Sequence, residues 1–402
     1  SQYLDDTWTG IHVFQPFDDF DNKYIISPAQ AQADGPLYDA VWGSNSGAMV
    51  AAWKTNNATI RTSYYIPIGT DALTDQFGDL GHDLTWWNAN HPDWVLYECD
   101  EQTVAYVGNL PEVPLDISNP AVISYLENTI GTYAEANGYA AIGADFAELN
   151  NPTGGGKGGS RGCGVWTSNH AVWVQKFSGQ QNDPAYAAAV LGWLSSFRSY
   201  LHGLSTPLAL WGNNVPGLVG LGNSGEQQIV SDLDIVEDES GDARYGKFAT
   251  DGYFNNRVAW ARYIQGLGKG YMPTALFHIS QLTNPQIDYS IASYLMSKEQ
   301  ASAMTADPYG FYGMEHYYPA YQAAIGSPCA EMYGGKNYNG QLVYFRKYGG
   351  AFAIESTSGS QTYTVTLPQP SYVDAVSGAT VTSPLQVPPY SGFVLLTPNG
   401  CS

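Results

Sequence analysis

The chain has few charged residues, and basic ones are especially scarce. Only 13% of its 402 residues are charged, about half of the fraction near 25% that is usual in soluble domains. Lysine and arginine number 16 against 37 acidic residues, which gives a formal net charge of -21. Because phosphate contacts need a basic footprint, this composition argues against nucleic acid and against an anionic membrane surface as partners.

The sequence also lacks the motifs of several enzyme classes. Its seven histidines form no HxH or HExxH pattern, and its four cysteines form no CxxC pair, so we expect no metal site. No run of about 18 apolar residues is present, so we expect no membrane-spanning helix. We therefore expect neither a metal nor another cofactor.

Short apolar runs alternate with helical patterns through the first 330 residues, and this alternation predicts a parallel sheet. The runs number eight, so we predict a (β/α)8 TIM barrel of the α/β class over residues 1–333. A doubly wound open sheet is the alternative, but no GxGxxG motif follows the first strand. The predicted strands are Gly10–Phe14, Ile60–Ile66, Trp94–Glu98, Tyr139–Asp145, Pro207–Trp211, Asp232–Glu237, Met272–Phe277 and Tyr309–Met314.

The pattern changes at about residue 334, where helical periodicity stops. Short strand-like runs follow, separated by Gly, Pro and Ser turns, and they predict a small all-β sandwich over residues 334–402. All eleven tryptophans lie between Trp8 and Trp260. This domain therefore lacks the tryptophan platform of many carbohydrate-binding modules, and we interpret it as structural.

The four cysteines allow three pairings. Their positions favour Cys99–Cys163, because both follow predicted barrel strands on the same rim, and this leaves Cys329–Cys401. Four free buried thiols are the alternative. The few charges, the cysteines and a chain that begins at Ser1 rather than Met together predict a secreted, extracellular protein.

Two predicted strands end in acidic residues, and strand ends form the floor of the active site in a β/α barrel. The fourth strand, in GYAAIGADFAELNN, ends at Asp145, and the sixth, in DLDIVEDES, ends at Glu237. Glycoside hydrolysis needs two carboxyl groups that flank the scissile bond, so these two are the first choice for the catalytic pair. Asp238, Glu239 and Glu148 are the second choice. Helix capping is the alternative for the acids beyond the strand ends.

Other residues near the predicted strand ends are candidates for binding a sugar. Pyranose rings stack on flat aromatic faces, and their hydroxyl groups bond to carboxylates, amides and imidazoles. Core packing is the alternative for the tryptophans, and a solvated rim is the alternative for the acids. The candidates are Trp42, Asp100, Trp211, Asn213, His278 and Glu315.

These features resemble those of secreted TIM-barrel glycoside hydrolases. The likeness lies in AIGADFAELNN, in DIVEDES and in the tail YVDAVSGATVTSPLQVPPYSGFVLLTP, which is similar to the β-sandwich that closes many such enzymes. The layout is similar to that of the α-galactosidase clan and of related poorly characterised glycosidases. That resemblance implies an acidic nucleophile on strand four, Asp145, and an acid/base on strand six, Glu237.

We therefore predict a glycoside hydrolase that cleaves a poly- or oligosaccharide by a retaining mechanism, at mildly acidic pH. The alternatives are a non-catalytic carbohydrate-binding barrel, an inverting glycosidase that uses the same acids, and a polysaccharide lyase or deacetylase. The expected partner is a carbohydrate substrate. The sequence carries no signal for an oligomeric state.

Overall fold

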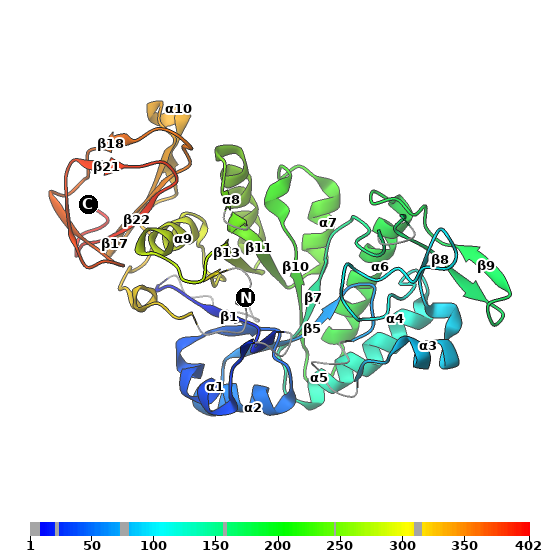
Figure 1. The fold of residues 1–402 in the computed structure, drawn as a ribbon. Coiled ribbons are helices and arrows are strands. Elements are labelled where there is room, and N and C mark those ends of the chain that lie inside the picture. The colour runs from blue at the N-terminus through cyan, green and yellow to red at the C-terminus, as the bar shows by residue number, and fades with distance from the viewer. Residues whose placement is uncertain (1–8, 21–23, 73–79, 156–158, 245–246, 309–315) are drawn as a thin grey trace.

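The computed structural model describes residues 9–20, 24–72, 80–155, 159–244, 247–308 and 316–402 (Figure 1). A barrel of parallel strands forms the centre of the molecule, and helices surround it. A small β-domain and the hairpin of strands β8 and β9 lie at opposite ends of the view in Figure 1.

Within the described residues, eight parallel strands hydrogen-bond to one another in chain order. The first and the last strand also hydrogen-bond to each other. The Phe14 N–H donates to the Met304 carbonyl oxygen at 3.1 Å, and the Met304 N–H donates to the His12 carbonyl oxygen at 2.9 Å. The sheet is therefore closed, and the predicted TIM barrel is confirmed. Its strands are β1 (Phe14–Pro16), β4 (Ala40–Trp42), β5 (Arg61–Pro67), β7 (Ala141–Asp145), β10 (Ala209–Asn213), β11 (Ile235–Arg244), β13 (Gly270–Phe277) and β14 (Thr305–Pro308).

Helices cover the outside of the barrel (Figure 1). Polar side chains cap several of them: the Asn119 side-chain oxygen accepts from the Ala121 N–H, and the Asp183 carboxylate from the Ala185 N–H. No helix of the described residues is long and apolar enough to cross a bilayer. The helices are α1 (Pro28–Asp34), α2 (Gly47–Asn56), α3 (Leu84–Asn90), α4 (Pro120–Leu126), α5 (Thr132–Ala136), α6 (Pro184–His202), α7 (Ser224–Asp232), α8 (Asp251–Gly266), α9 (Asn284–Ser297) and α10 (Lys336–Asn339).

The sequence prediction misses the barrel strands β4 and β14 and includes one strand that lies outside the barrel. The missed β4 is only three residues long. The predicted third strand, Trp94–Glu98, lies outside the barrel, where β6 (Tyr97–Glu98) pairs antiparallel with β8 (Gly162–Thr167), and β8 with β9 (Val172–Gln175). The errors at β4 and at Trp94–Glu98 cancel, so β7 and β11 are still strands four and six. The predicted eighth strand, Tyr309–Met314, lies outside the described residues, just after β14.

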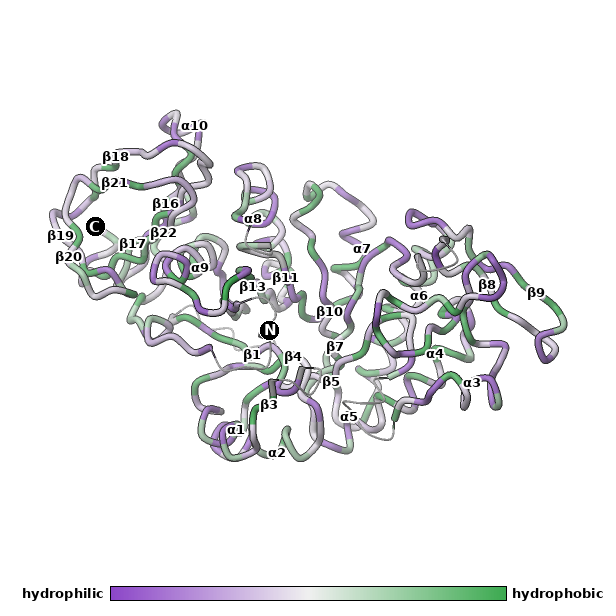
Figure 2. Tube along the Cα trace, in the orientation of Figure 1, coloured by the Kyte–Doolittle hydropathy of each residue, from purple (hydrophilic) through white to green (hydrophobic). Residues whose placement is uncertain are grey.

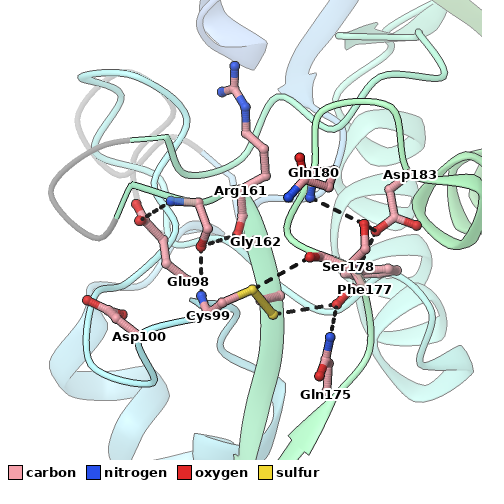
Figure 3. The surroundings of a disulfide bond; sticks show 12 residues. Glu98, Cys99, Asp100, Arg161, Gly162, Gln175, Phe177, Ser178, Gln180 and Asp183 are labelled. Carbon is pink, nitrogen blue, oxygen red and sulfur yellow. Dashed lines mark hydrogen bonds between the residues drawn. A yellow bond between two sulfur atoms is a disulfide. The ribbon is translucent and has the colours of Figure 1, made fainter.

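The sheet of β6, β8 and β9 joins two long excursions from the barrel, one after β5 and one after β7. The disulfide Cys99–Cys163 links them, with Cα atoms 5.1 Å apart (Figure 3). Cys329–Cys401 is the second disulfide, with Cα atoms 5.6 Å apart. Both predicted pairings are confirmed, although Cys99 follows β6 and not a barrel strand. Two short pairs of other strands are β2 (Asp19–Phe20) with β3 (Tyr24–Ile25), and β12 (Lys247–Phe248) with the end of β11.

Large aromatic side chains fill the inside of the barrel. The Trp42 and Trp211 rings meet edge to face with centroids 5.2 Å apart, and Phe14 packs against Trp211 at 6.2 Å. Gly143 on β7 leaves the space that Trp42 occupies, because a Cβ there would lie 2.9 Å from the Trp42 ring. Hydrophobic stretches accordingly lie along the central strands, and hydrophilic ones are frequent in the outer loops (Figure 2). The barrel thus has a solid floor beneath its mouth.

The C-terminal residues form a six-stranded antiparallel sheet, in the order β15-β16-β17-β22-β19-β20, and a two-stranded sheet of β18 and β21. Val343, Phe352, Val387 and Leu395 are among the buried residues of their shared core. An all-β C-terminal domain is therefore confirmed, while its boundary at residue 334 stays a prediction. The strands are β15 (Tyr333–Gly334), β16 (Val343–Tyr348), β17 (Ala351–Ser356), β18 (Tyr363–Val365), β19 (Ser371–Asp374), β20 (Thr380–Thr382), β21 (Leu385–Val387) and β22 (Gly392–Leu396).

The β-domain packs against α9 of the barrel. A Cβ on Gly392 would lie 2.6 Å from the Tyr289 Cα atom, so only glycine lets β22 come this close to the helix. The buried Arg346 side chain on β16 donates to the Leu295 carbonyl oxygen at 3.0 Å. Asp288 on α9 lies against Asp374 on β19, and both are buried. Burial, with the neighbouring Asp374, raises the pKa of Asp288 to about 8.

We expect the thermal stability of the protein to fall as the pH rises from 5 to 8. Folded Asp288 keeps its proton up to about pH 8, whereas an unfolded aspartate loses it near pH 4, at about its ordinary pKa of 3.9. The folded state therefore binds more protons in that window, and each further rise in pH favours unfolding. Melting temperatures measured by calorimetry at pH 5 and pH 8 test this.

The variant Asp288→Asn keeps the shape of the side chain but has no carboxyl group that can lose a proton. Its melting temperature should therefore change less between pH 5 and pH 8 than that of the parent. Asp93→Asn, at an exposed position, is the matched control and should behave like the parent. A parent protein that is more stable at pH 8 than at pH 5 would contradict the expectation.

Candidate active site

The end of β7 brings Asp145 to the mouth of the barrel. β7 is made of small buried residues, as suits a strand between two neighbours, β5 and β10. Asp145 is its last residue and pairs in register with Pro67 of β5. The next residue, Phe146, has a φ of 56°, which is unusual for a non-glycine residue and turns the chain sharply. The carboxylate therefore lies where the strand leaves the sheet.

Three donors surround the Asp145 carboxylate. The Tyr65 hydroxyl donates to Oδ2 at 2.5 Å, while the Phe146 N–H at 2.8 Å and the Asn213 side-chain amide at 3.0 Å donate to Oδ1. Burial and then the nearby Glu239 charge raise the pKa of Asp145 to about 6, against the lowering effect of these three bonds. The group thus titrates between its two charge states at mildly acidic pH.

Asn213, the last residue of β10, holds Asp145 and Glu239 together. Its Nδ2 atom lies 3.0 Å from Asp145 Oδ1 and 3.0 Å from Glu239 Oε2. With one hydrogen of the amide to each oxygen, and the two hydrogens about 120° apart, the accepting oxygens would lie about 5 Å from each other. Two carboxyl groups from strands four and six therefore face each other across one amide.

Glu237, the first choice from the sequence for the second acid, lies deeper in the barrel. It is 3% exposed, and its Oε1 accepts from the Thr274 hydroxyl at 2.7 Å. Burial and then the Glu239 charge raise its pKa well above the ordinary value. The reason for its depth is the length of β11, which continues to Arg244, so that Glu237 is not at the strand end.

Asp238, a second-choice residue, points to the other face of β11, as the alternation along a strand requires. It is fully buried and accepts from the Tyr271 hydroxyl at 2.8 Å. Neither Glu237 nor Asp238 lines the cleft at the barrel mouth. Glu239, another second-choice residue, does.

The cleft at the mouth has a volume of about 440 Å³. Its lining includes Asp145, Asn213, Glu239, Glu148 and Glu226. The Asn214 side-chain amide donates to Glu226, whose pKa is raised by burial. Among the lining residues none is a lysine, an arginine or a histidine, so the charged side chains of the cleft lining are all carboxylic acids.

The two tryptophans predicted to bind a sugar lie in the barrel interior. Trp211 is fully buried and Trp42 is 4% exposed. They pack against each other below the mouth, so their rings support the floor of the site and do not line the cleft.

The remaining candidates are scattered. Asp100 is exposed and closes its own turn by accepting from the N–H groups of Gln102 at 3.0 Å and Thr103 at 2.9 Å, outside the cleft lining. His278 follows β13 and is exposed, also outside that lining. Glu315 lies outside the described residues. Of the predicted binding residues, Asn213 is the one that the structure brings next to Asp145.

Sequence analysis overlooked Tyr65, which donates the shortest of the hydrogen bonds to Asp145. The residue lies on β5, and its ring packs against Phe17 with centroids 5.2 Å apart. Burial and then the Asp145 charge raise the pKa of Tyr65 well above its usual value, so the phenol keeps its proton. The available signal was its position near the end of the predicted strand Ile60–Ile66.

No protein-family model matches the chain, and no curated protein matches it in sequence. Its fold is similar to that of Amy13B of Eubacterium rectale, with a TM-score of 0.50 and 9% identity over 98% of this chain and 96% of that one. At this identity the likeness shows a shared fold. A noncanonic maltogenic α-amylase, AmyB of Thermotoga neapolitana, gives a TM-score of 0.48 and 11% identity over 98% and 97% of the two chains. An Anoxybacillus α-amylase gives 0.48 and 10% over 96% and 98%. The likeness to the α-galactosidase clan stays a prediction.

We expect Glu239→Gln to lower the pKa of Asp145 from about 6 toward the ordinary aspartate value, because the variant removes the neighbouring negative charge. Titration of the Asp145 carboxyl carbon by NMR measures this. Glu226→Gln removes a charge of the same cleft that is not among the causes of the raised Asp145 pKa, and it serves as the control, with a smaller shift expected. An unchanged Asp145 pKa in Glu239→Gln would show that the two carboxyl groups are not coupled.

Proposed function

We propose that the protein is a retaining glycoside hydrolase that cleaves an oligo- or polysaccharide, with Asp145 as nucleophile and Glu239 as acid/base. The observation that carries this proposal is that the Asn213 amide nitrogen lies 3.0 Å from one oxygen of each acid. With one amide hydrogen to each acid, this geometry gives a spacing of about 5 Å between those two oxygens. Retaining enzymes place their two carboxyl groups about 5–5.5 Å apart, whereas inverting ones need roughly 6.5–9.5 Å to admit a water molecule.

In the first step, Asp145 attacks the anomeric carbon and the glycosidic C–O bond breaks, while Glu239 gives its proton to the leaving oxygen. In the second step, a water molecule gives a proton to Glu239, its oxygen attacks the same carbon, and Asp145 leaves as a carboxylate. Asn213 orients both carboxyl groups through one amide. Tyr65 holds the Asp145 oxygen that does not bond to Asn213.

The charge of the cleft supports a neutral substrate. Asp145, Glu148, Glu226 and Glu239 all line it, without a basic side chain among the lining residues. A uronic acid or a sulfated sugar would bring a further negative charge into this field, and like charges at short distance repel. Neutral hydroxyl groups, in contrast, donate hydrogen bonds to carboxylates.

A panel of glycans should therefore include neutral chains that are hydrolysed and uronate-rich or sulfated chains that are not. On the substrate found, Asp145→Asn should lower kcat by about 10³-fold or more, because the nucleophile is removed. Glu239→Gln should also lose activity. With an aryl glycoside, whose leaving group departs without a proton from Glu239, added azide should restore turnover in Glu239→Gln, because a small anion needs no general base to attack the glycosyl-enzyme.

Glu237→Gln is the matched control for Glu239→Gln. A glutamine oxygen still accepts from Thr274, so this variant should keep activity within about tenfold of the parent. Activity that is lost in Glu237→Gln and kept in Glu239→Gln would contradict the assignment of the acid/base. Glycan binding without turnover in the parent protein would favour the non-catalytic barrel instead.

The pH profile of kcat/KM should fall on its acid side near pH 6. The nucleophile has to be ionised to attack, and the pKa of Asp145 is raised to about 6 by burial and by Glu239. Initial rates between pH 4 and pH 9 measure this fall of kcat/KM on the acid side. A profile that stays flat down to pH 4 would rule out Asp145 as the ionising group.

A further inference from the structure

The β-domain has a cleft of its own, separate from the one at the barrel mouth. Its volume is about 310 Å³, at the lower end of the range of about 300–1,000 Å³ that is common for ligand sites. The lining comes from β15, β16 and the segment between them, from Phe352 on β17, and from β18 with the residues that follow it. The cleft is large enough for a short stretch of a chain molecule.

Aromatic rings form one part of this lining. Tyr338 is 66% exposed, the highest exposure among the exposed large hydrophobic residues described. Its ring lies 5.7 Å from that of Tyr333, which in turn lies 5.4 Å from the ring of Phe345. Phe345 stacks on Phe352 at 5.7 Å within the domain core. The outer tyrosine is thus exposed but rests on a series of rings that reaches the core.

Neutral polar groups form the other part. Asn339, Gln341 and Thr364 line the cleft. The Asn339 side-chain oxygen accepts from the Gln341 N–H at 3.0 Å, and the Thr364 hydroxyl accepts from the Gln386 side-chain amide at 2.9 Å. These bonds fix the direction in which amide and hydroxyl groups face. Among the lining residues none is charged.

We infer that this cleft binds a short stretch of a neutral glycan, as a second carbohydrate site remote from catalysis. A pyranose ring has apolar C–H faces that stack on an aromatic ring, and hydroxyl groups at its edge that bond to amides and hydroxyls. A charged ligand would find no counter-charge here, and an apolar protein segment would leave the amide groups unpaired. In this site a tyrosine ring provides the stacking surface that a tryptophan ring provides in many carbohydrate-binding modules. A domain without tryptophan can therefore carry such a site.

The inference does not rest on the proposed reaction, and binding should be measured in the Asp145→Asn background so that no ligand is consumed. The probes are native gels that contain an α-glucan, a β-glucan, a mannan or a galactan. We expect at least one of them to retard the protein. Tyr338→Ala should weaken that retardation by about fivefold to tenfold, because one stacked ring is lost.

Val373→Ala is the matched control, since Val373 is 45% exposed on the same domain and outside the cleft. It should bind as the parent does. Gln341→Ala should weaken binding through the polar edge of the site. Equal retardation of Tyr338→Ala and its parent by every glycan that binds would overturn the inference, even if the parent enzyme hydrolyses that glycan. Weakened binding in Tyr338→Ala without any hydrolysis by the parent would support the inference while the proposed reaction failed.

Discussion

The side-chain amide of Asn213 fixes the distance between the two carboxyl groups on which the proposed chemistry depends. Each of its two hydrogens serves one carboxyl group, Asp145 or Glu239, so neither acid can move without loss of a bond. The same closeness makes each charge unfavourable to the other, and Glu239 contributes to the raised pKa of Asp145. The Asn213 contact therefore positions both acids, while burial and then the Glu239 charge raise the pKa of Asp145.

The barrel supplies the frame that makes this contact possible. Trp42 and Trp211 fill its interior, where Gly143 leaves room for Trp42, and the acids consequently lie above a packed floor. On the outside, the two excursions after β5 and β7 are joined by Cys99–Cys163 (Figure 3). Long connections of this kind commonly shape the binding region of a barrel. The β-domain, packed against α9, adds a second surface with sugar-binding chemistry.

Much of the fold was predictable from the sequence, because alternating apolar runs and helical patterns leave few architectures open. The site was predictable only in part. Asp145 ends a strand whose boundary is clear, whereas Glu237 and Glu239 face the same side of β11, and the sequence does not tell how far a strand extends beyond the barrel layer. Tyr65 and the bridging role of Asn213 depend on contacts between strands far apart in the chain, which no local pattern encodes.

The stereochemistry of the first product tests the central claim most directly. Proton NMR during hydrolysis of the substrate found in the glycan panel shows which anomer forms before mutarotation. Two carboxyl groups about 5 Å apart predict a product with the same anomeric configuration as the substrate, because two successive displacements restore it. A first product of the opposite configuration would contradict the account, since it would require a water molecule, and not Asp145, to attack the anomeric carbon.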